Sequence, residues 1–176
     1  MKLYRKLFIT CFSFSFLLLP SCQGVDNNRI PNMAVNISLG DAGLWNTYGV
    51  SGFGSNRNFI YNAGGASQPA GFTYKYGSAT GFGGVLLIEG INAFNPSIAT
   101  PLAYDLACPV ERIATVRVYI DSDTYVAVCS QCHSTYDVTM GAGAPLSGEA
   151  ATGKYKYALK SYNVIPTGNG GYYITN

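Results

Sequence analysis

The chain has 176 residues, with 11 Lys and Arg against 9 Asp and Glu, so its formal net charge at pH 7 is only +2. This balance gives no basic patch of the kind that nucleic-acid-binding domains carry, and no nucleic-acid partner is expected. Beyond the first 21 residues the chain is rich in Tyr, Gly, Val and Thr, a mixture typical of β-strands joined by tight turns, and its length suits one domain.

Residues 1–21 have the pattern of a secretory signal peptide. A basic start precedes an uncharged run from Leu7 to Leu19, which is shorter than the roughly 20 residues that span a bilayer. Ser21 then precedes Cys22, and a small residue before a cysteine at this place resembles the cleavage box of bacterial lipoproteins. The resemblance implies removal of residues 1–21, three of them basic and none acidic, so the formal net charge falls from +2 to −1.

Cys22 would then carry the acyl chains of a lipoprotein. Such chains tether a protein to a membrane surface without spanning the membrane. In these signals an Asp after the cysteine commonly marks retention at the inner membrane, and this chain has Gln23 instead. We therefore expect a lipid-anchored cell-envelope protein, at the outer membrane and facing the periplasm or the exterior. Residues 22–30 are predicted as the lipidated N-terminus and a polar tether, and residues 31–176 as a β domain.

The domain is predicted to be all-β, because no segment after residue 30 shows a helical period. Alternating polar and apolar residues indicate half-buried strands, and the unbroken apolar run Val85–Ile88 predicts a central strand. The loops are expected over residues 92–100 and 141–153. The predicted strands cover residues 35–39, 59–61, 72–76, 85–88, 115–120, 125–128, 136–138, 154–164 and 172–175, with hairpins at 121–124 and 168–171.

Three cysteines lie in the predicted β domain, namely Cys108, Cys129 and Cys132. The spacing of the second and third is that of tetrahedral thiolate sites, because a tight turn can point both sulfurs at one ion. A site with four ligands would take its last ligand from Glu111 or from His133. His133 directly follows a cysteine, and neighbouring residues in an extended strand point to opposite faces, so Glu111 is the more natural choice.

The order of these parts resembles a Rieske domain. LAYDLACP at residues 102–109 precedes a predicted hairpin, CSQCHSTYD follows at residues 129–137, and PLSGEA at residues 145–150 leads into a long strand and a closing hairpin. The resemblance covers roughly residues 84–176. It implies a fold of antiparallel sheets with a small cluster-binding subdomain, in which two loops carry the boxes C-x-H and C-x-x-H-G-S-x-[YF]-D and hold a [2Fe–2S] cluster.

The second box of this chain departs from the family pattern. When Ser134–Asp137 is aligned on the family's S-x-[YF]-D, Cys129 falls on the ligand cysteine and Cys132 on the ligand histidine. His133, the only histidine of the chain, then falls on the glycine. A cysteine in place of a histidine can still bind iron or zinc.

The first box departs more severely. Cys108 matches the ligand cysteine, but Val110 stands where the histidine belongs, so the usual ligand set of two histidines and two cysteines cannot form. The chain also resembles bacterial lipoproteins with a Rieske-like fold in which both boxes read C-x-x-C. Against that pattern Glu111 takes the place of the fourth cysteine.

Three interpretations of the cysteines remain open. The first is a binding or structural envelope module without a cluster, whose cysteines are free or oxidised. A bridge between Cys129 and Cys132 would close a very small loop, so pairing of Cys108 with either of them is at least as plausible. The second is one zinc ion on the three cysteines with Glu111 or water. The third is an electron-transfer protein with a [2Fe–2S] cluster on an altered ligand set. The histidine missing from the first box favours the first interpretation, and no redox partner is identified.

The sequence contains no other convincing set of catalytic residues, and no enzyme is predicted. Asp121 and Asp123 lie in a predicted hairpin turn, where a solvated role is expected. Ser147 has no histidine to serve it as a base. Trp45 and Tyr48 could line a ligand surface, although a place in the core is expected.

Overall fold

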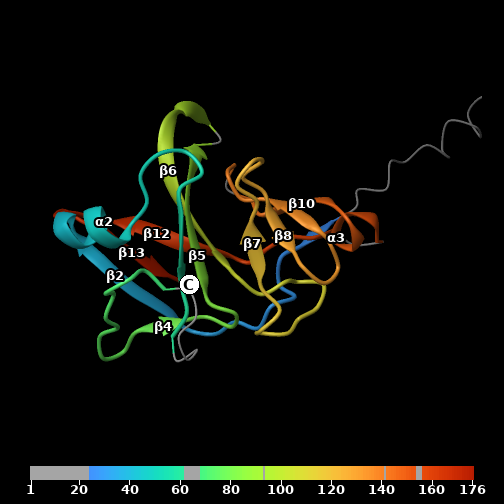
Figure 1. The fold of residues 1–176 in the computed structure, drawn as a ribbon, viewed down its shortest axis with the longest axis horizontal. Helices are drawn as coiled ribbons and strands as arrows, with labels where there is room; N and C mark the ends of the chain where they lie inside the picture. The colour runs from blue at the N-terminus through green and yellow to red at the C-terminus, as the bar shows by residue number, and fades with distance from the viewer. Residues whose placement is uncertain (1–23, 62–67, 93, 141, 154–155) are drawn as a thin grey trace, which may run out of the picture.

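The computed structural model describes residues 24–61, 68–92, 94–140, 142–153 and 156–176 (Figure 1). The predicted signal peptide and Cys22 lie outside these ranges. The described chain is mostly β, as predicted, and forms a seven-stranded antiparallel near-barrel and a smaller four-stranded antiparallel sheet. Of the helices in these ranges, none is long and apolar enough to cross a membrane.

The near-barrel carries its strands in the order β3-β5-β6-β12-β13-β2-β4. Its two edges lie close to each other, because the N–H of Tyr61, just after β3, donates to Oγ1 of Thr80 in β4 at 3.1 Å. The central position of Val85–Ile88 is confirmed, since β5 lies between β3 and β6. The bounds are β2 (Val35–Asp41), β3 (Asn56–Phe59), β4 (Ala79–Thr80), β5 (Val85–Asn92), β6 (Asn95–Asp105), β12 (Ser161–Pro166) and β13 (Gly170–Thr175).

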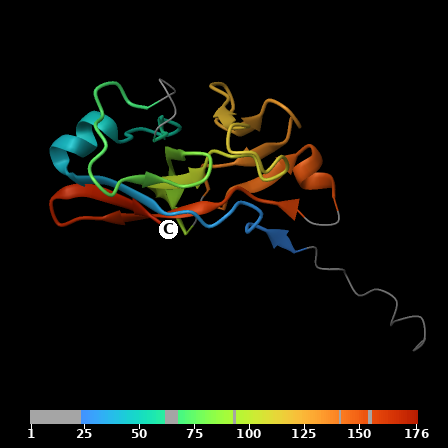
Figure 2. The same cartoon turned by 90° about the horizontal axis from the view of Figure 1, so that it is seen from below.

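The smaller sheet is inserted in the chain between β6 and β12. It has the order β10-β9-β8-β7, with β7 (Val118–Ile120), β8 (Ala127–Cys129), β9 (Thr135–Asp137) and β10 (Ala144–Ser147). The predicted hairpin of β7 and β8 is confirmed, with Val118 opposite Cys129. Figures 1 and 2 show this sheet beside the near-barrel. The two are joined where the N–H of Val118 donates to the carbonyl of Leu106 at 2.8 Å.

Two short helices were not predicted, α2 (Ala42–Tyr48) and α3 (Glu149–Thr152). They are too short for a helical period to stand out over 11 residues. A local signal for α2 is Asp41, whose side chain accepts the N–H of Leu44 at 2.9 Å as an N-cap. The prediction of an all-β domain is therefore correct in its main part and misses these two short helices.

The segment predicted as a tether contributes a strand. β1 (Val25–Asp26) pairs in parallel with β11 (Lys156–Tyr157). Figure 2 shows β1 in blue at the end of the domain where α3 lies. The guanidinium of Arg29 lies 3.9 Å from the ring centroid of Tyr157, a cation–π contact. This part of the chain is thus fixed to the domain from Val25 onward.

Four sequence predictions are wrong in detail. The loop expected over residues 141–153 contains β10, which pairs with β9, and α3. Residues 72–76 form no strand, because the alternating aromatic rings of Phe72 and Tyr74 pack edge-on against each other and against their neighbours instead of joining a sheet ladder. Residues 92–100 are not a loop, since β6 begins at Asn95 and its first residues are exposed on both faces, which removes the alternation. Residues 154–164 are not one strand, because β11 pairs with β1 while β12 joins the near-barrel.

β5 separates two hydrophobic cores. Successive residues of a strand point to opposite faces, so Leu86 and Ile88 pack into a core shared with the smaller sheet, whereas Val85 and Leu87 pack inside the near-barrel. All four side chains are at most 1% exposed. Burial on both faces explains why this strand reads as an unbroken apolar run.

The carboxylate of Asp105 joins three segments at the end of β6. It is fully buried and accepts hydrogen bonds from the N–H groups of Phe82, Gly83 and Ala107 and from the hydroxyl of Tyr162, at 2.5–2.9 Å. A Cβ on Gly83 would lie 2.7 Å from Oδ1 of Asp105, so only glycine fits there. Burial raises the pKa of Asp105, while these four donors lower it.

We expect Asp105→Ala to lower the free energy of unfolding by about 3 kcal/mol or more, because it leaves four buried donors without an acceptor. Urea unfolding followed by circular dichroism measures the change. Asp123→Ala is the matched control, since this residue is exposed in a turn. Equal stability of the two variants would show that Asp105 does not hold the segments together.

Candidate metal centre

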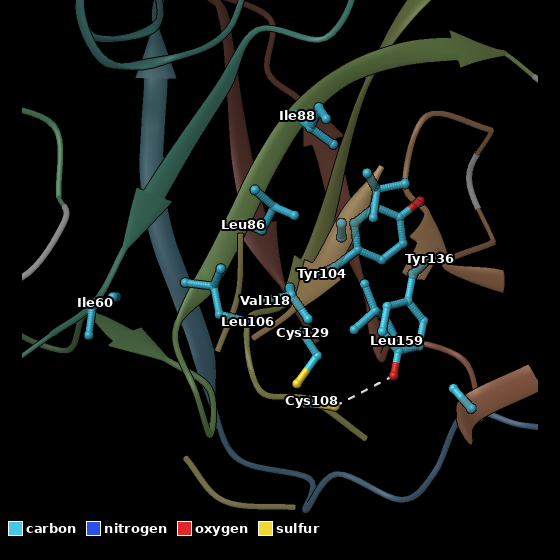
Figure 3. Close-up of a cluster of buried hydrophobic side chains, with 13 residues drawn as sticks. Ile60, Leu86, Ile88, Tyr104, Leu106, Cys108, Val118, Cys129, Tyr136 and Leu159 are labelled. Carbon is cyan, nitrogen blue, oxygen red and sulfur yellow. Dashed lines mark hydrogen bonds between the residues drawn. The ribbon is translucent and has the colours of Figure 1, made fainter. Parts of the chain in front are cut away.

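The three cysteines of the domain come together between the two sheets. Cys108 follows β6, Cys129 ends β8 and Cys132 lies in the turn before β9. Their Sγ atoms all lie within 4.8 Å of one another, and those of Cys108 and Cys132 are 3.6 Å apart. This confirms the prediction that two neighbouring loops gather these sulfurs. Figure 3 shows Cys108 and Cys129 beside the buried apolar side chains that pack against them.

A tight turn places Cys129 and Cys132 side by side. The N–H of His133 donates to the carbonyl of Cys129 at 3.1 Å, and the N–H of Cys129 donates to the carbonyl of Ser134 at 3.0 Å. The turn closes because His133 adopts a left-handed conformation with φ of 54°. His133 is exposed and does not belong to the cysteine group, as its register in the sequence predicted.

The loop after Cys108 folds back over its own sulfur. The backbone N–H groups of Val110 and Glu111 donate to the Cys108 thiol, and the N–H of Arg112 donates to the Cys108 carbonyl at 2.9 Å. N–H groups that point at a sulfur favour its thiolate form. Glu111 therefore contributes through its backbone, and its carboxylate lies outside the group that the three cysteines form.

Burial governs the protonation of Cys108. Burial raises the pKa of this thiol to about 12. Hydrogen bonds from the N–H of Glu111 and the hydroxyl of Tyr136 act in the opposite direction and lower the pKa, but by less. Tyr136 is itself fully buried, and its Oη lies 3.5 Å from Sγ of Cys108 (Figure 3). Burial also raises the pKa of Tyr136, so the phenol keeps its proton and remains a donor. Without a metal Cys108 is a neutral thiol, and a bound metal would displace its proton.

Ser134 supports the third cysteine. Its buried Oγ accepts the Cys132 thiol at 3.2 Å and the N–H of Ala150 in α3 at 3.0 Å. Gly148 packs against it so closely that a Cβ would lie 2.6 Å from Cα of Ser134. A hydroxyl can rotate, so Ser134 can donate to Cys132 once that sulfur is ionised.

Sequence reasoning missed these supporting roles. In the sequence, Ser134 and Tyr136 were used only to align the second box with the family pattern. The fold places their hydroxyl groups beside the sulfurs of Cys132 and Cys108. The only signal in the sequence was their position within five residues of a C-x-x-C turn. Outer partners of this kind orient ligands and tune their basicity.

The geometry fits one ion better than a two-iron cluster. Thiolates at about 2.3 Å from one tetrahedral ion lie about 3.8 Å apart, which matches the 3.6 Å between Cys108 and Cys132 and the spread of at most 4.8 Å for all three sulfurs. A [2Fe–2S] cluster needs two ligands on each iron. These pairs would lie on opposite sides of the cluster, whereas no two of the three sulfurs here are more than 4.8 Å apart.

The other candidates from the sequence do not join this group. Oδ1 of Asp121 accepts the N–H groups of Asp123 and Thr124 in an exposed turn, and these bonds lower its pKa, with the bonds from Thr124 foremost. Oγ of Ser147 lies 2.7 Å from Oγ1 of Thr135. Asp121 therefore has a structural role in its turn, and Ser147 has one at the edge of the smaller sheet.

We expect Cys132 to react with a thiol-alkylating reagent at least about tenfold faster than Cys108 and Cys129 in the folded, metal-free protein. Cys132 is partly exposed and the other two are buried, and reaction needs an accessible sulfur. Peptide mass mapping after timed native alkylation resolves the three sites. Denatured protein serves as the control, in which all three should react alike. Equal rates in the folded protein would contradict this arrangement.

Comparisons with protein families, with curated proteins and with solved structures give no match to this chain.

Proposed function

We propose that this protein is a lipid-anchored cell-envelope protein whose Rieske-like domain holds one zinc ion on Cys108, Cys129 and Cys132 in place of a standard cluster. The convergence of three sulfurs within 4.8 Å carries the proposal. Thiolates are soft ligands that suit zinc, and their spacing suits one tetrahedral ion. Water would supply the fourth ligand, or Glu111 would do so after its carboxylate, which lies outside the cysteine group, turns toward the three sulfurs.

Two features support the Rieske-like part of the proposal. The small sheet is inserted between strands of the larger one, and loops from either side of its first hairpin carry the cysteines. His133 falls on the glycine of the family's second box, and its φ of 54° is a value that glycine adopts most easily. A glycine-like conformation at this position is what the aligned box requires.

A bound zinc ion would tie the loop after β6 to the turn after β8. The chain's own groups would balance the negative charge of the thiolates: the N–H groups of Val110 and Glu111 and the hydroxyl of Tyr136 at Cys108, and the hydroxyl of Ser134 at Cys132. Such an arrangement is typical of a structural site, in which the metal stabilises the fold.

A metal-free binding or structural module is the second candidate. The burial that raises the pKa of Cys108 favours it, because a neutral thiol is stable in this apolar setting without a metal. In an oxidising envelope the close pair Cys108 and Cys132 is then the natural disulfide, with a disulfide reagent such as oxidised glutathione taking up the two electrons.

Zinc titration of the reduced protein under anaerobic conditions tests the metal. We expect one equivalent to bind, and Cys108→Ser, Cys129→Ser and Cys132→Ser each to weaken binding by more than the roughly tenfold that loss of an outer-shell partner costs. His133→Gln is the matched control and should leave the affinity unchanged.

Metal analysis separates the alternatives. Two irons per chain with visible absorption would favour the [2Fe–2S] cluster of an electron-transfer protein. Neither zinc nor iron binding would leave the metal-free module as the function.

The anchor is tested separately. We expect the wild type to sediment with membranes and to carry acyl chains on its N-terminal peptide, because lipidation of Cys22 is the proposed attachment. Cys22→Ser should leave the membrane fraction. Cys11→Ser is the matched control, since Cys11 lies within the predicted signal and should not affect anchoring. Membrane retention of Cys22→Ser would contradict the anchor.

A further inference from the structure

Glu89 continues the row of β5 residues that face the inside of the near-barrel. Val85 and Leu87 of this row are buried in the core, and alternation places Glu89 next in line. Its cross-strand partner is Pro101. Only 7% of Glu89 is exposed. Its carboxylate therefore lies almost buried at the end of the apolar core of the near-barrel.

A cavity of about 520 Å³ opens at this end of the near-barrel. Its walls include Glu89, Arg57, Ala99, Tyr172 and, from α2, Trp45. Both the volume and the position, at the mouth of a barrel, are usual for small-molecule sites. The cavity lies on the opposite face of β5 from the core that holds the cysteines.

The Glu89 carboxylate has no hydrogen-bond or ion-pair partner among the described residues. Its backbone is fixed on both sides, because its N–H donates to Ser55 at 2.9 Å and its carbonyl accepts the N–H of Gly54 at 2.8 Å. Burial raises the pKa of Glu89. The carboxylate opens on the cavity, but a carboxylate with so little access to water and no partner costs stability, and a ligand that donates to it would offset this cost.

Two aromatic rings stand in the same cavity. The centroids of Trp45 and Tyr172 are 4.3 Å apart, with the ring planes at 46°. Gly49 leaves room for the indole of Trp45, since a Cβ there would lie 2.6 Å from it. Aromatic faces attract cations, tryptophan most strongly.

We propose that this cavity binds a small molecule with an ammonium group, whose N–H groups donate to Glu89 and whose body packs on Trp45 and Tyr172. A metal ion is a poor fit, because hard cations require several oxygen ligands and Glu89 is the one carboxylate among the described residues of the wall. Arg57 lines the cavity as well, and its guanidinium donates to the carbonyl of Asn56 at 3.1 Å. The ligand is therefore a simple amine or an α-amino acid, whose carboxylate would meet Arg57.

Trp45 is the only tryptophan of the chain, so its fluorescence reports on this cavity directly. We would titrate the full lipidated protein in detergent with benzylamine, benzyl alcohol and phenylalanine. A saturable change is expected with benzylamine, and none with benzyl alcohol at the same concentrations. Tighter binding of phenylalanine than of benzylamine assigns the site to amino acids, and weaker binding assigns it to simple amines.

Glu89→Gln should weaken amine binding at least about tenfold, because it removes a charged acceptor. Glu149→Gln is the matched control, an exposed glutamate in α3, and should bind as the wild type does. Should Glu89→Gln fail to fold, Ala99→Phe fills the cavity from its exposed rim and should abolish the response. Equal responses to benzylamine and benzyl alcohol, no saturable response to either amine, or retained affinity in these variants would overturn the proposal.

Stability provides an independent readout for Glu89. Its folded-state pKa is raised above the ordinary 4.5, so its contribution to stability is full below pH 4.5 and is lost as the pH rises through the raised value. The groups that face it in the cavity are Arg57 and the two rings, and no ion pair forms among the described residues. Glu89→Gln should therefore raise the urea midpoint at pH 7, and this gain should disappear near pH 4.

Discussion

The hydrogen bonds to Asp105 fix the point at which the chain leaves the near-barrel. They join the end of β6 to the segment before β5 and, through Tyr162, to β12. Cys108 follows three residues later, so the same bonds set where the first loop of the cysteine group begins. A buried carboxylate is stable in this place only because four donors surround it. The position of the candidate metal centre therefore depends on a polar interaction that contributes no metal ligand.

β5 gives the protein two separate environments. One face supports the core that contains Cys108 and Cys129, and the other lines the near-barrel and ends at Glu89. The two sites show opposite chemical designs. At Cys108, backbone N–H groups and the Tyr136 hydroxyl lie against the sulfur, whereas the Glu89 carboxylate receives no donor from the described residues. One strand thus separates the core around the cysteines from the cavity that Glu89 lines.

Local patterns carried most of the successful predictions. Alternation identified β2, the unbroken apolar run identified β5, and turn residues placed the hairpins of β7 with β8 and of β12 with β13. The failures have physical causes as well. Aromatic rings that pack edge-on imitate a strand, an exposed hairpin arm lacks any alternation, and a helix of seven residues is too short to show its period.

The sequence by itself determined the C-x-x-C turn, its register on Tyr136 and Asp137, and the exclusion of His133 from the ligands, because these depend on neighbouring residues. Only the tertiary structure brought Cys108 to within 3.6 Å of Cys132 and set the Tyr136 hydroxyl against its sulfur. It also placed the Glu89 carboxylate at the mouth of the near-barrel without a partner among the described residues. Such contacts join segments that are distant in the chain, and they depend on the order of strands in the sheets, which local periodicity does not encode.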